Sequence, residues 1–334
     1  MSKRKILITG AAGFIGFHLA QRLLEDESNE LVLVDNLVRG RRDDQLSALL
    51  NSPRVRFQQL DLAQPGAFDS LGTGYDEVYH LAAIIGVANV LSRPHDVVRI
   101  NAITILAMLE WAMRGGAAKK VLFSSTSEAY AWTRLVMELP LPTPEIVPLA
   151  LTELDNPRSS YAGSKIFGEL AMHQYSRMFG TPFVNVRFHN VYGPRMGFDH
   201  VIPQLFQHAS QAGETLEVFS ADHRRAFCYV SDAIEMCIRA MRHPEAKAET
   251  LNVGNDQADV TIEALAHEIV VRCGKQLKLI PVTAAHDPIK HRCPDISRAK
   301  RLLQFTPEVT LAEGLDLTLD WYRQALAETQ LATV

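Results

Sequence analysis

A tyrosine and a lysine four residues apart, Tyr161 and Lys165, are the side chains of this sequence best suited to proton transfer. On a helix, a spacing of four places the phenol and the ammonium on the same face. A free tyrosine has a pKa near ~10, and a fixed positive charge close by stabilises the phenolate. Tyr161 is therefore a candidate base near neutral pH, although this spacing also occurs by chance in helices that do no chemistry.

A run of hydroxyl side chains that ends in a carboxylate offers a second set of reactive groups. Residues 124–128 read Ser-Ser-Thr-Ser-Glu and follow apolar, strand-like residues. In parallel sheets the carboxyl ends of the strands face the ligand crevice. Thr126, Ser127 and Glu128 are therefore placed to reach a substrate, whereas Ser124 and Ser125 could equally form a turn.

Three glycines near the N-terminus predict a dinucleotide site. Gly10, Gly13 and Gly16 follow the first strand-like run and lead into an amphipathic helix, and Phe14 and Ile15 lie between the last two of them. Glycines there allow a tight turn and let a pyrophosphate approach the amides of the helix N-terminus. The spacing is GxxGxxG rather than GxGxxG, so the motif is specific only because it sits between a strand and a helix.

An acidic residue at the end of the second expected strand favours one cofactor. Asp35 lies 19 residues after Gly16, where a carboxylate can accept hydrogen bonds from the adenosine ribose hydroxyls. It would repel a 2'-phosphate, which favours NAD over NADP. Asp61, at the end of the third expected strand, either faces the adenine or caps the next helix. Three nearby arginines could instead serve a phosphorylated ribose: Arg39, Arg41 and Arg42.

Strand-like runs alternate with helix-length segments, which is typical of βαβ units around a parallel sheet. Strands are expected at 5–9, 31–34, 55–60, 77–80, 121–124 and 183–188. Helices are expected at 97–113, 201–212, 232–242, 262–273 and 311–325. We therefore expect an α/β fold with two parts. The first is a Rossmann doubly wound parallel sheet over 1–189, completed by segments near 226–256, and the second is a smaller substrate-binding domain over 190–334.

Five prolines between residues 139 and 157 exclude a helix interior or a central strand from that stretch. A surface loop is one interpretation. A lid over the site is the other, because long loops in compact domains often cover active sites.

The composition excludes several classes of protein. Of 334 residues, 47% are hydrophobic and 22% are charged, as in ordinary globular chains. The formal net charge of -4 predicts no binding to nucleic acid or to an anionic membrane, and no stretch reaches the ~20 apolar residues of a membrane span. The four cysteines are widely spaced and are expected to stay reduced in the cytoplasm. The histidines form no metal-ligand motif, so we expect no metal.

Together these motifs resemble the extended short-chain dehydrogenases/reductases that act on nucleotide sugars, the NAD-dependent epimerase, dehydratase and decarboxylase family. The matches run from Lys5 to about Tyr322. Besides the residues above they comprise Asn36, Leu62, His80-Leu81-Ala82-Ala83, Asn101, the run from Arg187 to Arg195, the segment around Arg225, and Arg292-Cys293-Pro294-Asp295.

The resemblance implies a role for each match. Thr126 would bond the reacting sugar hydroxyl, Tyr161 would remove its proton, and Lys165 would hold the nicotinamide ribose while a hydride passes from sugar C4 to NAD. The cofactor contacts would be Gly10, Gly13, Phe14, Ile15, Gly16, Asp35, Asn36, Asp61, Leu62, Leu81, Ala82, Ala83, Asn101, Ser124, Tyr161 and Lys165. The nucleotide-sugar contacts would be Ser125, Ser127, Asn190, Arg195, Arg225 and Arg292, although surface pairing is an alternative for Arg195, Arg224 and Arg292.

Glu128 favours one reaction among those open to a C4 ketone. In this family 4-epimerases need no carboxylate here, 4,6-dehydratases resemble Thr-Asp-Glu, and uronate decarboxylases resemble the Thr-Ser-Glu of residues 126–128. The run Pro157-Arg158-Ser159-Ser160-Tyr161 also resembles the decarboxylases. We therefore expect decarboxylation of a nucleotide-linked hexuronate such as UDP-glucuronate. A 4-epimerase and a 4,6-dehydratase are the alternatives, and a non-catalytic NAD(H)-binding regulator is an alternative of another class.

The same resemblance implies a homodimer, in which the helices near 97–113 and 161–179 pair across a two-fold axis. Helix faces that are buried within one subunit would produce the same sequence pattern.

Overall fold

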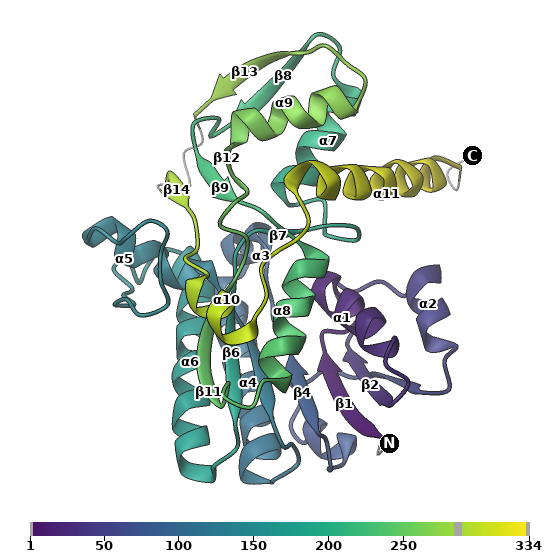
Figure 1. The fold of residues 1–334 in the computed structure, drawn as a ribbon, viewed down its shortest axis with the longest axis vertical. Coiled ribbons are helices and arrows are strands. Elements are labelled where there is room, and N and C mark those ends of the chain that lie inside the picture. The colour runs from purple at the N-terminus through teal and green to yellow at the C-terminus, as the bar shows by residue number, and fades with distance from the viewer. Residues whose placement is uncertain (1–2, 284–288, 332–334) are drawn as a thin grey trace.

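A parallel sheet of seven strands forms the centre of the protein (Figure 1). The structure is a computed structural model that describes residues 3–283 and 289–331. The strand order is β11-β6-β5-β4-β1-β2-β3, and every neighbouring pair is parallel. The strands are β1 (Arg4–Thr9), β2 (Asn29–Asp35), β3 (Val55–Gln59), β4 (Glu77–His80), β5 (Val121–Thr126), β6 (Phe183–Phe188) and β11 (Ala248–Val253).

This arrangement confirms the expected Rossmann fold and the six strands expected in the first half of the chain. The strand order reverses between β1 and β4, so their carboxyl ends open a crevice at the switch point. Strands β4 and β5 are buried along their whole length. Buried and exposed residues do not alternate along these two strands, because helices cover both faces of a parallel sheet.

Two hydrophobic clusters, one on each face, hold the helices to the sheet. Ile6 and Ile8 of β1 pack into one cluster and Leu7 into the other, because successive strand residues point to opposite faces. Helices α1 (Phe14–Leu24) and α8 (Val230–Arg242) pack together in the first cluster. Helices α4 (Pro94–Leu109) and α6 (Arg158–Phe179) lie side by side over the second (Figure 1). The segment 97–113 is thus helical as expected, although its last turn, Glu110–Arg114, is a π-helix.

The chain beyond β6 contributes elements to both the central sheet and a smaller lobe. The smaller lobe contains the strand pair β8 (Thr215–Phe219) and β13 (Lys278–Val282) (Figure 1). Helices α7 (Val201–Gln211), α9 (Ile262–Arg272) and α11 (Leu311–Leu331) pack there, so the helices expected beyond residue 190 are confirmed. Strand β11 returns to pair with β6. The boundary at 189/190 stays a prediction. The remaining short elements are α2 (Asp44–Leu50), α3 (Val87–Ser92), α5 (Ala131–Val136), α10 (Ser297–Leu303), the 3-10 helices η1 (Ala67–Leu71) and η3 (Ser127–Tyr130), β7 (Val191–Tyr192), β9 (Arg224–Ala226), β10 (Cys228–Tyr229), β12 (Asp259–Thr261) and β14 (His291–Arg292).

The proline-rich segment 139–157 contains no helix and only an isolated bridge, between Thr143 and Pro294. Its Glu145 carboxylate accepts a hydrogen bond of 2.9 Å from the backbone amide of Asn252 on β11. The segment is therefore held against both the sheet and the chain that follows β14, beside the carboxyl ends of the strands.

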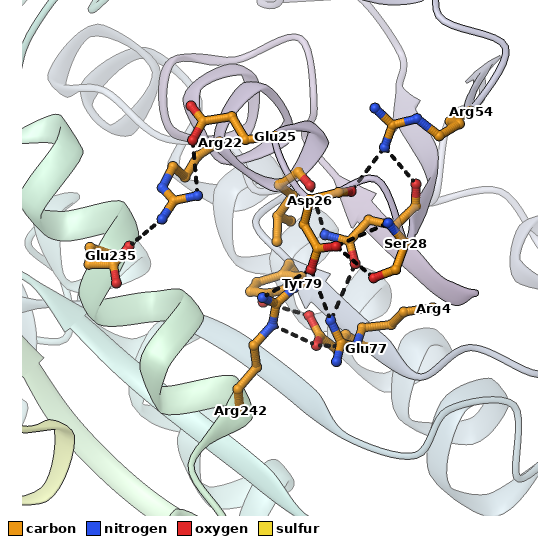
Figure 2. Close-up of polar contacts among 12 residues, drawn as sticks. Arg4, Arg22, Glu25, Asp26, Ser28, Arg54, Glu77, Tyr79, Glu235 and Arg242 are labelled. Carbon is orange, nitrogen blue, oxygen red and sulfur yellow. Dashed lines mark hydrogen bonds and ion pairs between the residues drawn. The ribbon is translucent and has the colours of Figure 1, made fainter. Parts of the chain in front are cut away.

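A buried charge network closes the opposite end of the sheet (Figure 2). The Glu77 side chain, at the start of β4, lies 3.3 Å from Arg4 Nε and 3.2 Å from Arg242 Nε, and it accepts a hydrogen bond of 2.8 Å from the Tyr79 hydroxyl. Glu77 is 5% exposed. The network ties β1, β4 and α8 together at a distance from the crevice, so its role is structural.

Replacing Glu77 by Gln is expected to lower the free energy of unfolding by about 2 kcal/mol, because hydrogen bonds to a charged group would be lost in a buried place. Urea unfolding of the purified protein measures this. Glu235→Gln is the matched control, because Glu235 bonds the more exposed Arg22 and Arg239. Surface pairs of this kind contribute ~0–1 kcal/mol. Equal losses in the two variants would contradict the structural role of Glu77.

Candidate active site

The backbone of the glycine turn between β1 and α1 leaves no room for a side chain at two of its glycines. Gly10 has a φ of +70°, and a Cβ there would lie 2.9 Å from the amide nitrogen of Ala82. A Cβ on Gly16 would lie 2.2 Å from the carbonyl oxygen of Gly10. The first turn of α1 carries no acidic residue, and its cap, Gly13, offers no side-chain hydrogen bond. The turn therefore presents a bare helix N-terminus, which suits a pyrophosphate.

Asp35 is fixed directly over this turn. Its two carboxylate oxygens accept hydrogen bonds from the amides of Ala12 (3.0 Å) and Leu37 (2.8 Å). Burial raises the pKa of Asp35, and the two amide bonds oppose that rise. Because carboxylate oxygens have further lone pairs, Asp35 can still accept from ribose hydroxyls.

The other expected cofactor residues surround the same crevice to different degrees. Leu81, Ala82 and Ala83 follow β4 and are half-buried, with the amides of Leu81 and Ala82 bonded to Thr9 Oγ1 at 3.2 Å. Asn101 is buried on α4, where its side chain bonds the Ile84 amide (2.8 Å) and holds that loop. Phe14 and Ile15 open α1, Leu62 is buried in the core, and Asn36 is exposed.

The cofactor contacts considered for Asp61 and Arg39 stay predictions. Asp61 is exposed and accepts from the Ala63 amide and from Gln64, which is a turn-capping arrangement, so its contact with adenine stays a prediction. The Arg39 guanidinium lies near Gly86 and Gly197, across the crevice.

Replacing Gly16 by Ala is expected to weaken NAD binding at least about tenfold, because the new Cβ must push the Gly10 carbonyl out of the phosphate turn. Calorimetric titration of the purified variant with NAD measures the change in affinity. Gly213→Ala is the control, since a Cβ there meets no atom within 4 Å. A Gly16→Ala protein that binds NAD like wild type would exclude the turn as the phosphate site.

Tyr161, Lys165 and Thr126 meet at the carboxyl end of β5. The Thr126 hydroxyl hydrogen-bonds the Tyr161 phenol. Lys165 is 3% exposed, and its Nζ donates to the Ser124 carbonyl at 2.7 Å and lies 5.9 Å from the centre of the Tyr161 ring. The one-turn spacing in α6 and the strand end of β5 thus assemble the predicted group.

In the cofactor-free protein, burial opposes the ionisation of both groups. Burial raises the pKa of Tyr161 to about 12; the hydrogen bond from Thr126 and the charge of Arg39 oppose the rise, and the charge of Glu128 adds to it. Burial also lowers the pKa of Lys165 to about 7, against the attraction of Glu169. Desolvation acts on both groups and penalises their charged forms. The positive nicotinamide ring is therefore expected to favour the phenolate in addition to the lysine.

Glu128 lies between two arginines in the turn after β5. Its Oε1 is bonded to Arg292 of β14, and its Oε2 is 3.6 Å from Arg158 at the start of α6. Ser127, beside it, lines a pocket with Arg292. The segments 126–128, 158–165 and 291–293 are far apart in sequence and converge here, which gives the site a carboxylate and two guanidinium groups beside the phenol.

The structure does not bring every predicted substrate residue to this point. Ser125 is 2% exposed, and its hydroxyl bonds Glu169 at 2.5 Å, inside the protein. Arg195 pairs with Asp43 although its side chain is only 6% exposed, and Arg225 donates to the carbonyls of Ile289 and Lys290. The substrate roles of Ser125, Arg195 and Arg225 therefore stay predictions. So does that of Asn190, whose side chain donates to the Ala226 carbonyl at 3.2 Å and whose φ is +40°.

One residue of the site was given no role of its own by the sequence reasoning, and another escaped it. Arg158 belongs to the run 157–161 that resembles the decarboxylases, and its position three residues before Tyr161 on one helix was a usable signal of a role in the site. Arg134 lies on α5 and lines the same pocket as Arg292 and Ser127. Nothing in the sequence marks Arg134, because α5 precedes an irregular segment whose path only the fold defines.

Comparisons with known proteins agree with this geometry. The model of the NAD dependent epimerase/dehydratase family matches residues 6–254. UDP-glucuronic acid decarboxylase 6 of Arabidopsis thaliana is 32% identical over 330 residues, which are 97% of this chain and 90% of that protein. UDP-N-acetyl-alpha-D-glucosaminuronate decarboxylase of Bacillus cytotoxicus is 30% identical, over 96% of this chain and 98% of that protein. The crystal structure of UDP-glucuronic acid 4-epimerase from Bacillus cereus, in complex with UDP-glucuronic acid and NAD, is 27% identical, with a TM-score of 0.82 over 96% and 99% of the two chains.

The fold and the site define an NAD-dependent enzyme that modifies nucleotide sugars. The chain belongs to the NAD dependent epimerase/dehydratase family. NAD as cofactor, expected from Asp35, is confirmed, and the glycine turn, Asp35 and Lys165 fit that group. In the described part of the chain, no helix is long and apolar enough to cross a bilayer, and no three potential metal-ligating side chains gather.

Proposed function

We propose that this enzyme decarboxylates a nucleotide-linked hexuronate, with UDP-glucuronate as the expected substrate. The observation that carries the proposal is the position of Glu128 between Arg292 and Arg158, beside Tyr161. A neutral hexose offers these two guanidinium groups only uncharged oxygens, whereas a C6 carboxylate can be bound at two points by an arginine. The names of several relatives, among them the two decarboxylases described above, support the same reaction.

Three residues of the site have separate roles in the first step, the oxidation at C4. Tyr161 takes the proton of the C4 hydroxyl, Thr126 orients that hydroxyl through its bond to the phenol, and Lys165 stays fixed by the Ser124 carbonyl. Bound NAD would supply the acceptor and later the donor of the C4 hydride, and its positively charged oxidised ring would favour the phenolate.

The second step uses the carbonyl formed at C4. The carboxylate at C6 is then β to a ketone, so the C5–C6 bond breaks, carbon dioxide leaves, and the electron pair moves into the C4 carbonyl. A proton must return to C5, and Glu128 is the carboxyl group of the site that can handle it. Arg292 already bonds Glu128. A substrate carboxylate would therefore compete for the same guanidinium and would lie beside the carboxyl group of Glu128.

The test is to incubate the purified enzyme and NAD with UDP-glucuronate and with a panel of UDP-, dTDP-, GDP- and CDP-sugars, and to follow carbon dioxide and product mass. Carbon dioxide from the hexuronate alone is the expected result. An isomer of unchanged mass would identify a 4-epimerase, and loss of water a dehydratase. If no sugar reacts although NAD binds, the non-catalytic regulator replaces the enzyme.

We also propose a homodimer that is formed through α4 and α6. These helices bury one face in the second cluster and leave large apolar residues exposed, among them Val98, Ile103, Leu170 and Met178. Exposed apolar groups on two adjacent helices are typical of an interface. Sedimentation as a monomer at micromolar concentration would contradict the proposal. The cytoplasmic location and the UDP moiety stay predictions of the same kind.

A further inference from the structure

A small pocket lies between α5, the end of β6 and β14, next to the end of the strand that carries Thr126. Ser127, next to Thr126, lines it, and so do Arg134, His189 and Arg292. His189 follows the last residue of β6 and is 2% exposed. None of the steps described above uses this histidine.

The orientation of a neighbouring amide fixes which nitrogen of His189 carries a proton. Asn252 Nδ2 lies 3.0 Å from the carbonyl oxygens of both Thr143 and Asp295, and only an NH₂ group can donate to two carbonyls. Asn252 Oδ1 is therefore the acceptor of this amide. It receives the Tyr130 hydroxyl at 2.8 Å and lies 3.0 Å from His189 Nε2, so Nε2 must donate.

His189 is consequently left with a free lone pair. Burial lowers the pKa of His189 to about 3, the bond to Asn252 opposes this, and the charges of Arg187, Arg292 and Arg134 add to it. A neutral imidazole with its proton on Nε2 has an acceptor at Nδ1. This Nδ1 is buried and has no hydrogen-bond partner among residues 3–283 and 289–331. Such an orphaned acceptor costs free energy unless a bound water or a ligand supplies a donor.

The charges around the pocket define that donor. The acceptors of Arg134 in the described ranges are neutral, the Pro140 carbonyl and the Thr143 hydroxyl. Arg134 also lies close enough to Arg292 for the like charge to lower its pKa, after burial. A positively charged donor would be repelled by these guanidinium groups, whereas a hydroxyl on an anionic sugar would be attracted together with its carboxylate.

We infer that His189 is a specificity residue, whose Nδ1 accepts a hydrogen bond from a hydroxyl of the sugar in the pocket that Arg134 makes electropositive. The inference rests on the proposed function for the anionic nature of the sugar. The ring is held for this task by a chain of hydrogen bonds, from Glu169 through Arg187 and Tyr130 to Asn252.

Two substitutions at this position separate the acceptor from the structural bond. His189→Gln retains a donor that can reach Asn252 Oδ1 and removes the acceptor at the place of Nδ1. His189→Asn retains a polar group near the place of Nδ1. With UDP-glucuronate, we expect His189→Gln to raise KM about tenfold with little change in kcat, because a contact made equally in ground and transition states is lost. His189→Asn should lie closer to wild type.

Deoxy substrates show whether the lost contact is to the sugar. Wild type should discriminate at least about tenfold against UDP-glucuronate that lacks either the C2 or the C3 hydroxyl, and His189→Gln should lose most of that discrimination. If a trapped water satisfies Nδ1 instead, the discrimination of wild type and of His189→Gln will be the same, and the inference falls.

Nitrogen NMR of the histidine-labelled wild type tests the tautomer without a substitution. We expect an unprotonated Nδ1 that persists at pH 5 and whose signal shifts when UDP-glucuronate binds. A proton on Nδ1 would overturn the inference while decarboxylation stood. Absence of carbon dioxide from UDP-glucuronate, with the tautomer as stated, would instead contradict the proposed function.

Discussion

Phenylalanine in place of Tyr161 is expected to lower kcat by roughly 10²–10⁴-fold, the usual contribution of a positioned proton acceptor. The C4 hydroxyl would then have to lose its proton without a base, since a threonine hydroxyl is not basic and Lys165 is committed to the Ser124 carbonyl. NAD affinity should stay within about threefold of wild type, because the glycine turn and Asp35 are untouched. Steady-state kinetics and a calorimetric NAD titration measure the two effects.

The matched control is Tyr175→Phe, fourteen residues further along α6, where the hydroxyl bonds Glu110 at the surface. It should turn over like wild type. Full turnover by the Tyr161 variant would refute the assigned mechanism.

The pH dependence of the wild type follows from the same residue. Burial raises the pKa of Tyr161 to about 12 in the cofactor-free protein, and the phenolate, which is the reactive form, accumulates as pH rises. Turnover should therefore rise with pH along its acidic limb. Bound NAD should move that limb below 12, because its positive ring favours the phenolate. Spectroscopic titration of tyrosinate absorbance, with and without NAD, should show the shift in wild type and not in Tyr161→Phe.

Glutamine in place of Glu128 is expected to lower the rate of carbon dioxide release at least about 10²-fold, which is the lower range for loss of an acid–base group. Glutamine fills the same space and can still accept from Arg292, so the fold of the turn should persist. It cannot carry a proton to C5. The KM for UDP-glucuronate should stay unchanged or fall, since Arg292 and Arg158 lose a competing carboxylate.

Stopped-flow absorbance of NADH should show that C4 oxidation continues in Glu128→Gln, which separates the two chemical steps. Glu138→Gln, at an exposed glutamate ten residues later, is the control and should release carbon dioxide normally. An unchanged product profile and rate for Glu128→Gln would remove the reason for preferring decarboxylation to epimerisation.

The cofactor half of the site was predictable because its residues are local. Gly10, Gly13 and Gly16 act through one turn, and Asp35 reaches that turn from the neighbouring strand through a single amide bond to Ala12. Strand and helix periods place such groups without knowledge of the rest of the fold. The same holds for Tyr161 and Lys165, which share one helical face.

The substrate half could not be predicted in the same way. Ser125 and Ser127 look equivalent in sequence, yet one is bonded to Glu169 in the interior and the other lines the pocket. Arg225 and Arg292 sit on paired strands, β9 and β14, yet the first holds backbone carbonyls and the second meets Glu128.

By itself the amino-acid sequence determined the Rossmann sheet, the glycine turn and the helical face that Tyr161 and Lys165 share, because each depends on spacings within one or two adjacent elements. Only the tertiary structure decided that Glu128 lies between two arginines, that Arg134 charges the pocket, and that His189 retains a free acceptor. These facts depend on contacts between different elements of the fold, such as that of Glu128 with Arg292, 164 positions away. They also depend on desolvation, which exists only once the chain is packed and which here raises the pKa of Tyr161 and lowers that of Lys165.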